Sequence, residues 1–308
     1  MKELNDSTFR WVEKVLEPGS IIENIKPLPG ATSSSLYSIQ TQIASYVLRL
    51  IDNKEWLQEE PDLAPHEAAS LKYASQSHLP TPELVAFDKN GDYCGVPAVL
   101  MTRIPGKVDL KPDNLDLWLD WLAKSLSRIH ILDGGDFSWH YFSYTDISNL
   151  EIPQWSSRPD LWKKAFQIVK GPKPKAPECF IHRDFHPANI LWQNGRISGV
   201  VDWSNACRGP AWVDLGHCRM NLVMLYGIEA ADRFLHTYLA STDDPFKYEQ
   251  YFDLLSLCDF TLPGPPEVYK GWQAFGIHDL TDNMMRERTD EFLIRVMERG
   301  DYDGNPTI

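Results

Sequence analysis

The segment that most constrains how this chain can fold is a polar loop near position 184, set between apolar residues. It places His182, Asp184 and Asn189 in the pattern H-x-D-x-x-x-x-N, and an apolar strand then leads to Asp202. The dipeptide Asn194-Gly195 interrupts the apolar residues and is typical of a tight β-hairpin turn. The hairpin predicts that the chain doubles back and brings Asp202 beside Asn189.

These residue types suit phosphoryl transfer. The transferred group carries several negative charges, so a protein promotes its transfer mainly by positioning it and neutralising charge. An aspartate beside an acceptor hydroxyl can orient that hydroxyl and take its proton, which is the role expected of Asp184. Asn189 and Asp202 offer the hard oxygen ligands that Mg²⁺ prefers. The loop therefore favours Mg²⁺-dependent phosphoryl transfer with Asp184 as the catalytic base.

The same residues, together with a Gly-Pro-x-x-x-Asp-Leu element at 209–215, resemble the aminoglycoside phosphotransferase family. That family shares the protein-kinase fold and is similar to choline kinases. The resemblance implies a bilobal α+β fold, with a small antiparallel-sheet N-lobe and a larger, mostly helical C-lobe. We expect residues 1–104 to form the nucleotide-gripping N-lobe with a hinge at its end, and residues 105–308 to carry the catalytic loop and acceptor site. It also implies that Asp214 supports the loop rather than reacting.

The N-terminal part matches the family more loosely. Arg49 occupies the strand position where the family usually has Lys, and arginine can still hold phosphates. Glu67 falls where the family's helix glutamate pairs with that cation. The resemblance implies a phosphate-covering turn at Gly30, Ser33 and Ser34, although the turn lacks the G-x-G-x-x-G pattern. It also implies a hinge whose backbone at Arg103 and Ile104 binds the nucleobase of ATP or GTP.

The hydrophobic pattern agrees with this division. Strands are expected at 21–25, 36–40, 45–51, 83–87 and 98–102. Helices are expected at 6–17, 65–76, 114–132 and 159–170, and over most of 212–300. Asp113 is the expected N-cap of the third of these helices.

Composition narrows the environment and the partners. Five cysteines without a C-x-x-C pair argue against a disulfide framework or zinc ribbon and favour a reducing cytosol. The polar, acidic start and the absence of long apolar runs predict a cytoplasmic protein without a signal peptide or membrane span. A net charge of −13 without a Lys/Arg run argues against nucleic-acid binding. The charge fits either simple solubility or attraction of a cationic acceptor.

Three alternatives to a small-molecule phosphotransferase follow from the pattern. A protein kinase is disfavoured, because Asp202 is followed by Trp-Ser instead of Phe-Gly and eleven residues to Asp214 leave no room for an activation loop. Alternation of His182, Asp184 and His186 also suggests a transition-metal hydrolase. A non-catalytic nucleotide-binding pseudokinase is the main rival. Within the phosphotransferase hypothesis, the hydroxylated acceptor is an aminoglycoside or another amino sugar or amino alcohol, so resistance and metabolic roles both remain open.

Overall fold

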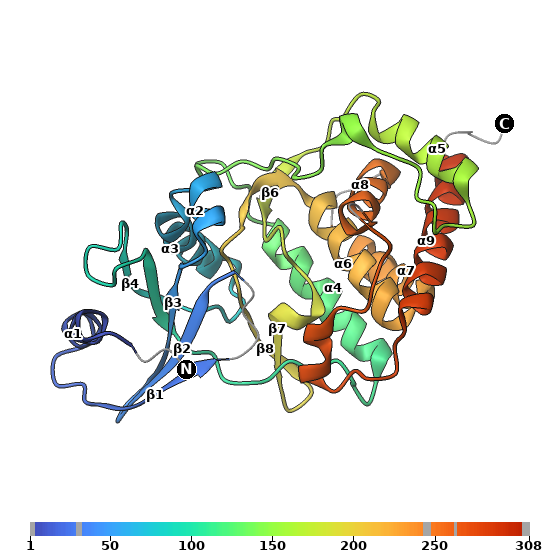
Figure 1. Cartoon of the computed structure of the whole chain (residues 1–308). Coiled ribbons are helices and arrows are strands. Elements are labelled where there is room, and N and C mark those ends of the chain that lie inside the picture. The colour runs from blue at the N-terminus through green and yellow to red at the C-terminus, as the bar shows by residue number, and fades with distance from the viewer. Residues whose placement is uncertain (1–3, 29–32, 243–247, 262–263, 304–308) are drawn as a thin grey trace. The chain divides into compact units, whose positions relative to one another are not determined.

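The computed structural model describes residues 4–28, 33–242, 248–261 and 264–303. The chain forms two compact units (Figure 1). The first unit consists of Met1–Lys107, Leu191–Gln193 and Ser198–Ala206, and the second of Val108–Ile190, Asn194–Ile197 and Cys207–Ile308.

The first unit is built on a five-stranded antiparallel sheet with the strand order β1-β2-β3-β5-β4. The strands are β1 (Ile22–Leu28), β2 (Ser35–Thr41), β3 (Ser45–Leu50), β4 (Leu84–Asp88) and β5 (Ala98–Thr102). Each overlaps one of the five strands expected from the sequence, because short β-branched and aromatic runs bounded by polar turns favour strands.

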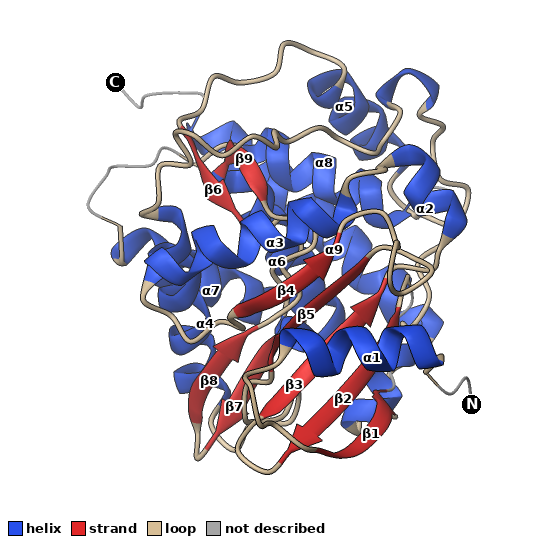
Figure 2. Cartoon of the chain, turned by 90° about the vertical axis from the view of Figure 1, so that its left-hand side faces the viewer, coloured by secondary structure: helices blue, strands red, loops and turns tan. Residues whose placement is uncertain are grey.

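Helix α1 (Asp6–Val15) lies across one face of this sheet (Figure 2). Its apolar residues Trp11 and Val12 pack into one hydrophobic cluster with Tyr46 and Leu48 of β3. The helix begins where the Asn5 side chain accepts a hydrogen bond from the Thr8 N–H. Because successive side chains of a strand point to opposite faces, the residues of β3 between these buried ones lie on the other face of the sheet.

The opposite alternation of β3 places Arg49 away from that cluster and beside helix α3 (Leu63–Ala74). Glu67, on α3, receives a hydrogen bond from Arg49. A short helix that the sequence pattern did not predict, α2 (Lys54–Glu59), precedes α3 and is capped by Asn53, whose side chain accepts from two backbone N–H groups. The sheet and α3 together therefore hold the buried Arg49 in one orientation.

The second unit is mainly helical. Its helices are α4 (Leu115–His130), α5 (Pro159–Val169), α6 (Ala211–Tyr226), α7 (Ile228–Ala240), α8 (Gln250–Thr261) and α9 (Asp282–Asp303). Helix α6 is buried along most of its length and contacts α7, α8 and α9. A helix buried along most of its length forms the centre of a helical core.

Two short β pairs frame the polar loop. β6 (Glu178–Ile181) pairs with β9 (Cys207–Pro210), a pairing that the sequence did not predict. β7 (Ile190–Gln193) and β8 (Arg196–Val200) form the expected hairpin. Asn194 and Gly195 have φ of 52° and 72°, the left-handed geometry that a tight hairpin turn requires. The predicted turn is confirmed.

The predicted α+β architecture, with an antiparallel sheet in the N-terminal part and helices beyond it, is confirmed. The expected N-cap of the helix at 114–132 is wrong by one residue. Asn114 caps α4, because its side chain accepts from the Leu117 N–H, and the helix ends at His130. Both side chains can cap a helix, so the sequence did not distinguish Asp113 from its neighbour.

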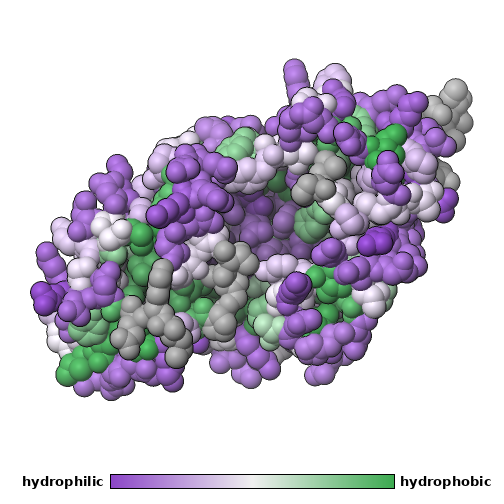
Figure 3. Space-filling model, viewed as in Figure 1, coloured by the Kyte–Doolittle hydropathy of each residue, from purple (hydrophilic) through white to green (hydrophobic). Residues whose placement is uncertain are grey.

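Hydrophilic residues cover most of the face in Figure 3, and hydrophobic residues form separate patches on it. Within the described ranges, no helix combines the length and the apolar character needed to cross a bilayer.

Candidate active site

The Asp184 carboxylate lies in the loop after β6 and is fixed by Asn189. The Asn189 Nδ2 donates to the Asp184 backbone oxygen at 2.9 Å and to its Oδ2 at 3.1 Å. Asn189 ends a single 3₁₀ turn, Pro187–Asn189, which His186 caps by accepting from the Ala188 N–H. The structure therefore brings Asp184 and Asn189 together, with Oδ2 of the aspartate held and Oδ1 directed elsewhere.

Asp214, in the first turn of α6, anchors the start of this loop. It is fully buried and accepts from the backbone N–H of His182 at 2.8 Å and of Arg183 at 2.6 Å. His130, at the end of α4, lies 3.0 Å from the same carboxylate through Nε2, and its Nδ1 lies 2.7 Å from the Tyr238 hydroxyl. Asp214 therefore makes the contacts with the loop that its expected supporting role requires.

Two histidines face the other oxygen of Asp184. His217 Nε2 lies 3.1 Å from Asp184 Oδ1, and His186 Nε2 lies 3.6 Å from the same atom. Burial alone would raise the pKa of Asp184, but the attraction of His186 and His217 outweighs it and holds that pKa well below its usual range. Asp184 therefore stays ionised at neutral pH, the state a proton acceptor requires.

Sequence reasoning missed His217. It lies three residues after Asp214 on α6, so both side chains share one face of that helix. This spacing was the available signal, but it needed the knowledge that Asp214 points into the loop. His182, which the metal-hydrolase alternative used, is fully buried and its ring packs against Phe185.

The His217–Asp184 contact predicts a pH-dependent stability. Burial alone would lower the pKa of His217, but the Asp184 carboxylate raises it above its ordinary value. The contact therefore stabilises the fold fully below about pH 6.5 and progressively less as pH rises through the raised pKa. We expect the free energy of unfolding to fall less steeply in His217→Gln than in the wild type over this range.

Urea denaturation followed by tryptophan fluorescence, from about pH 6 to pH 9, measures this slope. His236→Gln, which removes an exposed histidine of α7, is the matched control and should retain the wild-type slope. Equal slopes in His217→Gln and the wild type would contradict the assignment.

Arg183 links the loop to three aromatic rings. Its backbone has φ of 66°, which is uncommon for a non-glycine residue. The Arg183 side chain donates a hydrogen bond to the Phe142 carbonyl at 2.8 Å. Its guanidinium carbon lies 4.2 Å from the ring centres of Phe142 and Tyr144 and 5.6 Å from that of Tyr141. These contacts, and the bond to Asp214, hold the residue before Asp184 in a strained conformation.

The first unit gathers a second group of predicted residues around Arg49. Its Nη2 donates to Asp202 Oδ1 at 2.9 Å, its Nη1 to Ser34 Oγ at 3.1 Å, and its Nε to Glu67 at 3.1 Å. Asp202 has φ of 64° and also accepts from the Ser204 hydroxyl through Oδ1. Burial alone would lower the pKa of Arg49, but Asp202 and Glu67 raise it, so the guanidinium stays charged.

A single ammonium group does not reproduce these three divergent bonds. We expect Arg49→Lys to lower the free energy of unfolding by about 1–3 kcal/mol, because buried acceptors lose their donors. Denaturant melts measure this change. Arg10→Lys, at an exposed position of α1, should change stability by less than about 0.5 kcal/mol. An Arg49→Lys protein as stable as the wild type would show that the three bonds contribute nothing.

The remaining predicted residues are placed as follows. Ser33 lies in a bend before β2, and Gly30 lies outside the described residues. The Arg103 N–H donates to the Ser45 carbonyl at 2.9 Å, and its side chain donates to Ser38 at 3.0 Å. The Ile104 side chain packs so closely on Gly199 that an added Cβ there would lie 2.4 Å from it.

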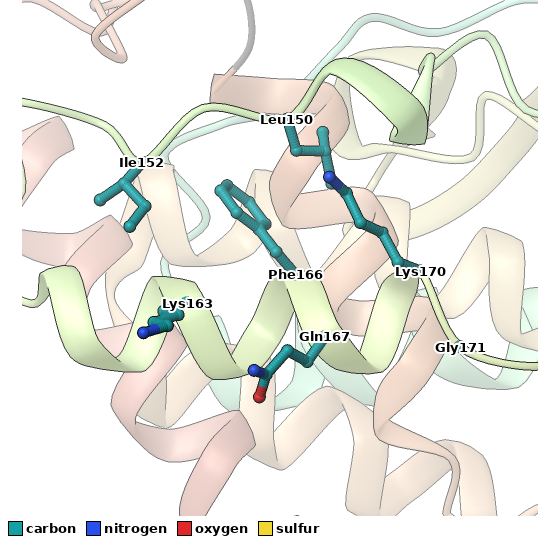
Figure 4. A pocket seen from close by; sticks show the side chains of 7 residues that line it. All are labelled: Leu150, Ile152, Lys163, Phe166, Gln167, Lys170 and Gly171. Atoms are coloured by element: carbon teal, nitrogen blue, oxygen red, sulfur yellow. The ribbon is translucent and has the colours of Figure 1, made fainter.

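A shallow groove of about 470 Å³ lies elsewhere on the helical unit, between α5 and residues 150–152 (Figure 4). The Phe166 ring points from α5 toward Leu150 and Ile152, and Lys170 stands beside them. None of the predicted site residues lines this groove, so it is separate from the Asp184 loop.

Comparison with known proteins places these residues in a family. Residues 24–251 match the model of the phosphotransferase enzyme family, APH. An aminoglycoside 3'-phosphotransferase of Enterococcus faecalis is 19% identical over 46% of this chain and 60% of that protein. A homoserine kinase of Polaromonas naphthalenivorans is 23% identical over 64% of this chain and 65% of that protein. The chain thus spans less than two thirds of these curated relatives.

Solved structures show the same fold. A putative aminoglycoside phosphotransferase from Ralstonia eutropha JMP134 has a TM-score of 0.64 at 12% identity and covers 95% of this chain and 98% of that one. The amicoumacin kinase hAmiN, solved with AMP-PNP and Ca²⁺, has a TM-score of 0.58 at 16% identity and covers 96% and 94%. The family match extends over most of the chain and includes the Asp184 loop, Asp202 and Asp214. The chain therefore belongs to the phosphotransferase enzyme family.

Proposed function

We propose that this chain transfers the γ-phosphate of ATP or GTP to a hydroxyl group of a small molecule, with Asp184 as the catalytic base. The observation that carries the proposal is the state of the Asp184 carboxylate. Asn189 donates a hydrogen bond to its Oδ2, and two histidines keep the carboxylate ionised. Its Oδ1 accepts no hydrogen bond from Asn189 and faces these histidines. Such an oxygen can orient an acceptor hydroxyl and accept its proton.

Arg49 would hold the nucleotide phosphates, oriented by Glu67. Its guanidinium is buried, charged and fixed by three partners, so it would be in place before nucleotide binds. Ser33, Ser34 and Gly30 would form the turn over the phosphates. Fixed positive charge aimed at developing negative charge is a major source of catalysis in phosphoryl transfer.

The chemistry of the donor atoms fits Mg²⁺. Both side-chain hydrogen bonds of Asn189 use Nδ2, which leaves its Oδ1 to bind a cation. The hydrogen bonds that Asp202 accepts from Arg49 and Ser204 use Oδ1, which leaves Oδ2. Amide and carboxylate oxygens are ligands that Mg²⁺ prefers, and we assign the metal to these two residues. When bound, Mg²⁺ would neutralise the charge of the nucleotide phosphates.

The nucleobase would contact the backbone at Arg103 and Ile104. The Arg103 N–H is already bonded to Ser45, so the carbonyl of Arg103 and the backbone of Ile104 are the groups we assign to the base. These groups belong to the backbone, so no side chain at this position indicates adenine or guanine. The test therefore includes both ATP and GTP.

Two acceptor classes are supported by relatives. One relative is named an aminoglycoside phosphotransferase and another a homoserine kinase, and they are 19% and 23% identical to this chain. Both acceptors carry a hydroxyl and an amino group. The net charge of −13 would attract a polycationic aminoglycoside, whereas homoserine is a zwitterion without net charge. We propose a hydroxylated amine, either an amino sugar or an amino alcohol, as the acceptor.

Mass spectrometry across an acceptor panel tests the proposal. The protein is incubated with Mg²⁺ and either ATP or GTP, and with aminoglycosides, homoserine, choline or amino sugars. A phosphorylated product that the wild type forms and the Asp184→Asn protein does not would support the proposal and identify the acceptor class. Nucleotide binding without transfer to any hydroxylated amine would favour the pseudokinase alternative.

A further inference from the structure

Asp184, His186 and His217 bring three metal-ligating side chains to one point. One ligand atom from each lies within 4.8 Å of the other two. The two imidazole rings have centroids 5.8 Å apart and are inclined by 57°, so they approach from different directions. The three residues come from the loop after β6 and from α6, which Asp214 ties together. The scaffold around them is therefore held in place by buried hydrogen bonds.

Their spacing is that of a metal's coordination sphere. Two ligands bound at zinc distances in a tetrahedral arrangement lie about 3.3 Å apart. Asp184 Oδ1 lies 3.1 Å from His217 Nε2 and 3.6 Å from His186 Nε2, on either side of that value. The three ligand atoms lie within 4.8 Å of one another, so small side-chain adjustments would bring them to a common ion.

The ligand atoms are available. Asp184 uses Oδ2 and its backbone oxygen to hold Asn189, which leaves Oδ1 facing the imidazoles. His217 Nε2 is shielded from solvent and faces that same Oδ1 at 3.1 Å. A metal ion bound between them would take the place of the proton on Nε2, which is released to solvent.

Two imidazole nitrogens and one carboxylate oxygen select against Mg²⁺, which prefers oxygen ligands in octahedral geometry. They suit Zn²⁺ and neighbouring transition metals. We propose that Asp184, His186 and His217 form a transition-metal site of the Zn²⁺ class. It has three protein ligands and one position open to water, and is separate from the Mg²⁺ ligands assigned to Asn189 and Asp202.

His186 is the weakest of the three ligands. Its Nδ1 accepts a long hydrogen bond, 3.3 Å, from the Ala188 N–H, so its proton lies on Nε2 in the metal-free protein. To coordinate through Nε2, the ring must move that proton to Nδ1 and give up the Ala188 bond. The loss of one long hydrogen bond is small beside the free energy of zinc binding.

Metal at this site would inhibit transfer, a consequence that rests on the proposed function. A metal ion on Oδ1 occupies the oxygen that would otherwise take the acceptor's proton. Inhibition should therefore be competitive with the acceptor and not relieved by excess Mg²⁺. Zn²⁺ acting at the nucleotide's metal site would instead compete with Mg²⁺.

Binding is tested without any transfer reaction, so failure of the proposed function does not affect the result. Chelator-stripped protein is titrated with Zn²⁺ by calorimetry in the absence of nucleotide, which itself binds zinc. Co²⁺ is used in parallel, because tetrahedral Co²⁺ absorbs strongly in the visible range. We expect one tight site, with a tetrahedral Co²⁺ spectrum that excess Mg²⁺ does not abolish.

His217→Gln is the decisive variant. It should weaken Zn²⁺ binding at least about 100-fold, because loss even of a ligand's supporting partner weakens metal affinity 10–100-fold. His186→Gln should weaken it less, and His236→Gln, an exposed control, should bind as the wild type does. A cooperative denaturation curve establishes that each variant is folded. The proposal is overturned if the wild type binds no Zn²⁺, or if His217→Gln binds it with unchanged affinity.

Discussion

Asp184→Asn is expected to lower the rate of phosphate transfer by about 10²–10⁴-fold, the usual contribution of a general base. The substitution is nearly isosteric. An asparagine at position 184 can still accept the hydrogen bond from Asn189 Nδ2, so the 3₁₀ turn keeps its anchor. What is lost is an ionised oxygen opposite His186 and His217, and with it the ability to take a proton. Nucleotide affinity should stay within a few-fold of the wild type.

Steady-state kinetics with the acceptor found by mass spectrometry, and nucleotide binding by calorimetry, measure the two effects separately. Asp160→Asn, at an exposed carboxylate in the first turn of α5, is the matched control and should retain wild-type turnover. If Asp184→Asn retains near wild-type turnover, Asp184 is not the base. If turnover and nucleotide affinity are lost together, the substitution has disturbed the fold and the catalytic role remains unsupported.

The sequence predicted the parts of the site that local chemistry determines. The turn at Asn194-Gly195 could be located because two consecutive residues in the left-handed region have few alternatives. The pairing of Arg49 with Glu67 was implied by the family resemblance, and the structure shows the hydrogen bond between them. Such features can be predicted because the residues that form them have few alternative roles.

The contacts that the sequence did not predict join positions far apart in the chain. His217 reaches Asp184 only because α6 begins at β9, and β9 pairs with β6, directly before the loop. The contact of Arg49 with Asp202 spans 153 positions, and no local pattern specifies it. Four-residue strands such as β6 and β9 carry too little periodicity to be recognised, so the position of α6 relative to the loop, and with it His217, was missed.

The support of the loop by Asp214 gives the second large expected effect. Three donors converge on this buried carboxylate: the N–H groups of His182 and Arg183, and His130 Nε2. An asparagine has one acceptor oxygen and an NH₂ group, so at least one donor would face another donor. Hydrogen bonds to charged groups contribute about 1.5–3 kcal/mol each. We expect Asp214→Asn to lower the free energy of unfolding by about 3 kcal/mol.

The same substitution should reduce turnover about 100-fold without touching substrate, because a displacement of about 1 Å at a reacting group has this effect. Arg183 is held at a φ of 66° next to Asp184, partly by its bond to Asp214, and loss of that bond lets the strained residue relax. Urea denaturation and kinetics measure both changes. The control is Asp282→Asn, an exposed carboxylate that accepts one backbone bond, from Val268, and should cost less than about 1 kcal/mol. Equal stability losses in the two variants would mean that Asp214 is an ordinary capping residue, because its burial and three donors would then contribute nothing beyond a single exposed hydrogen bond.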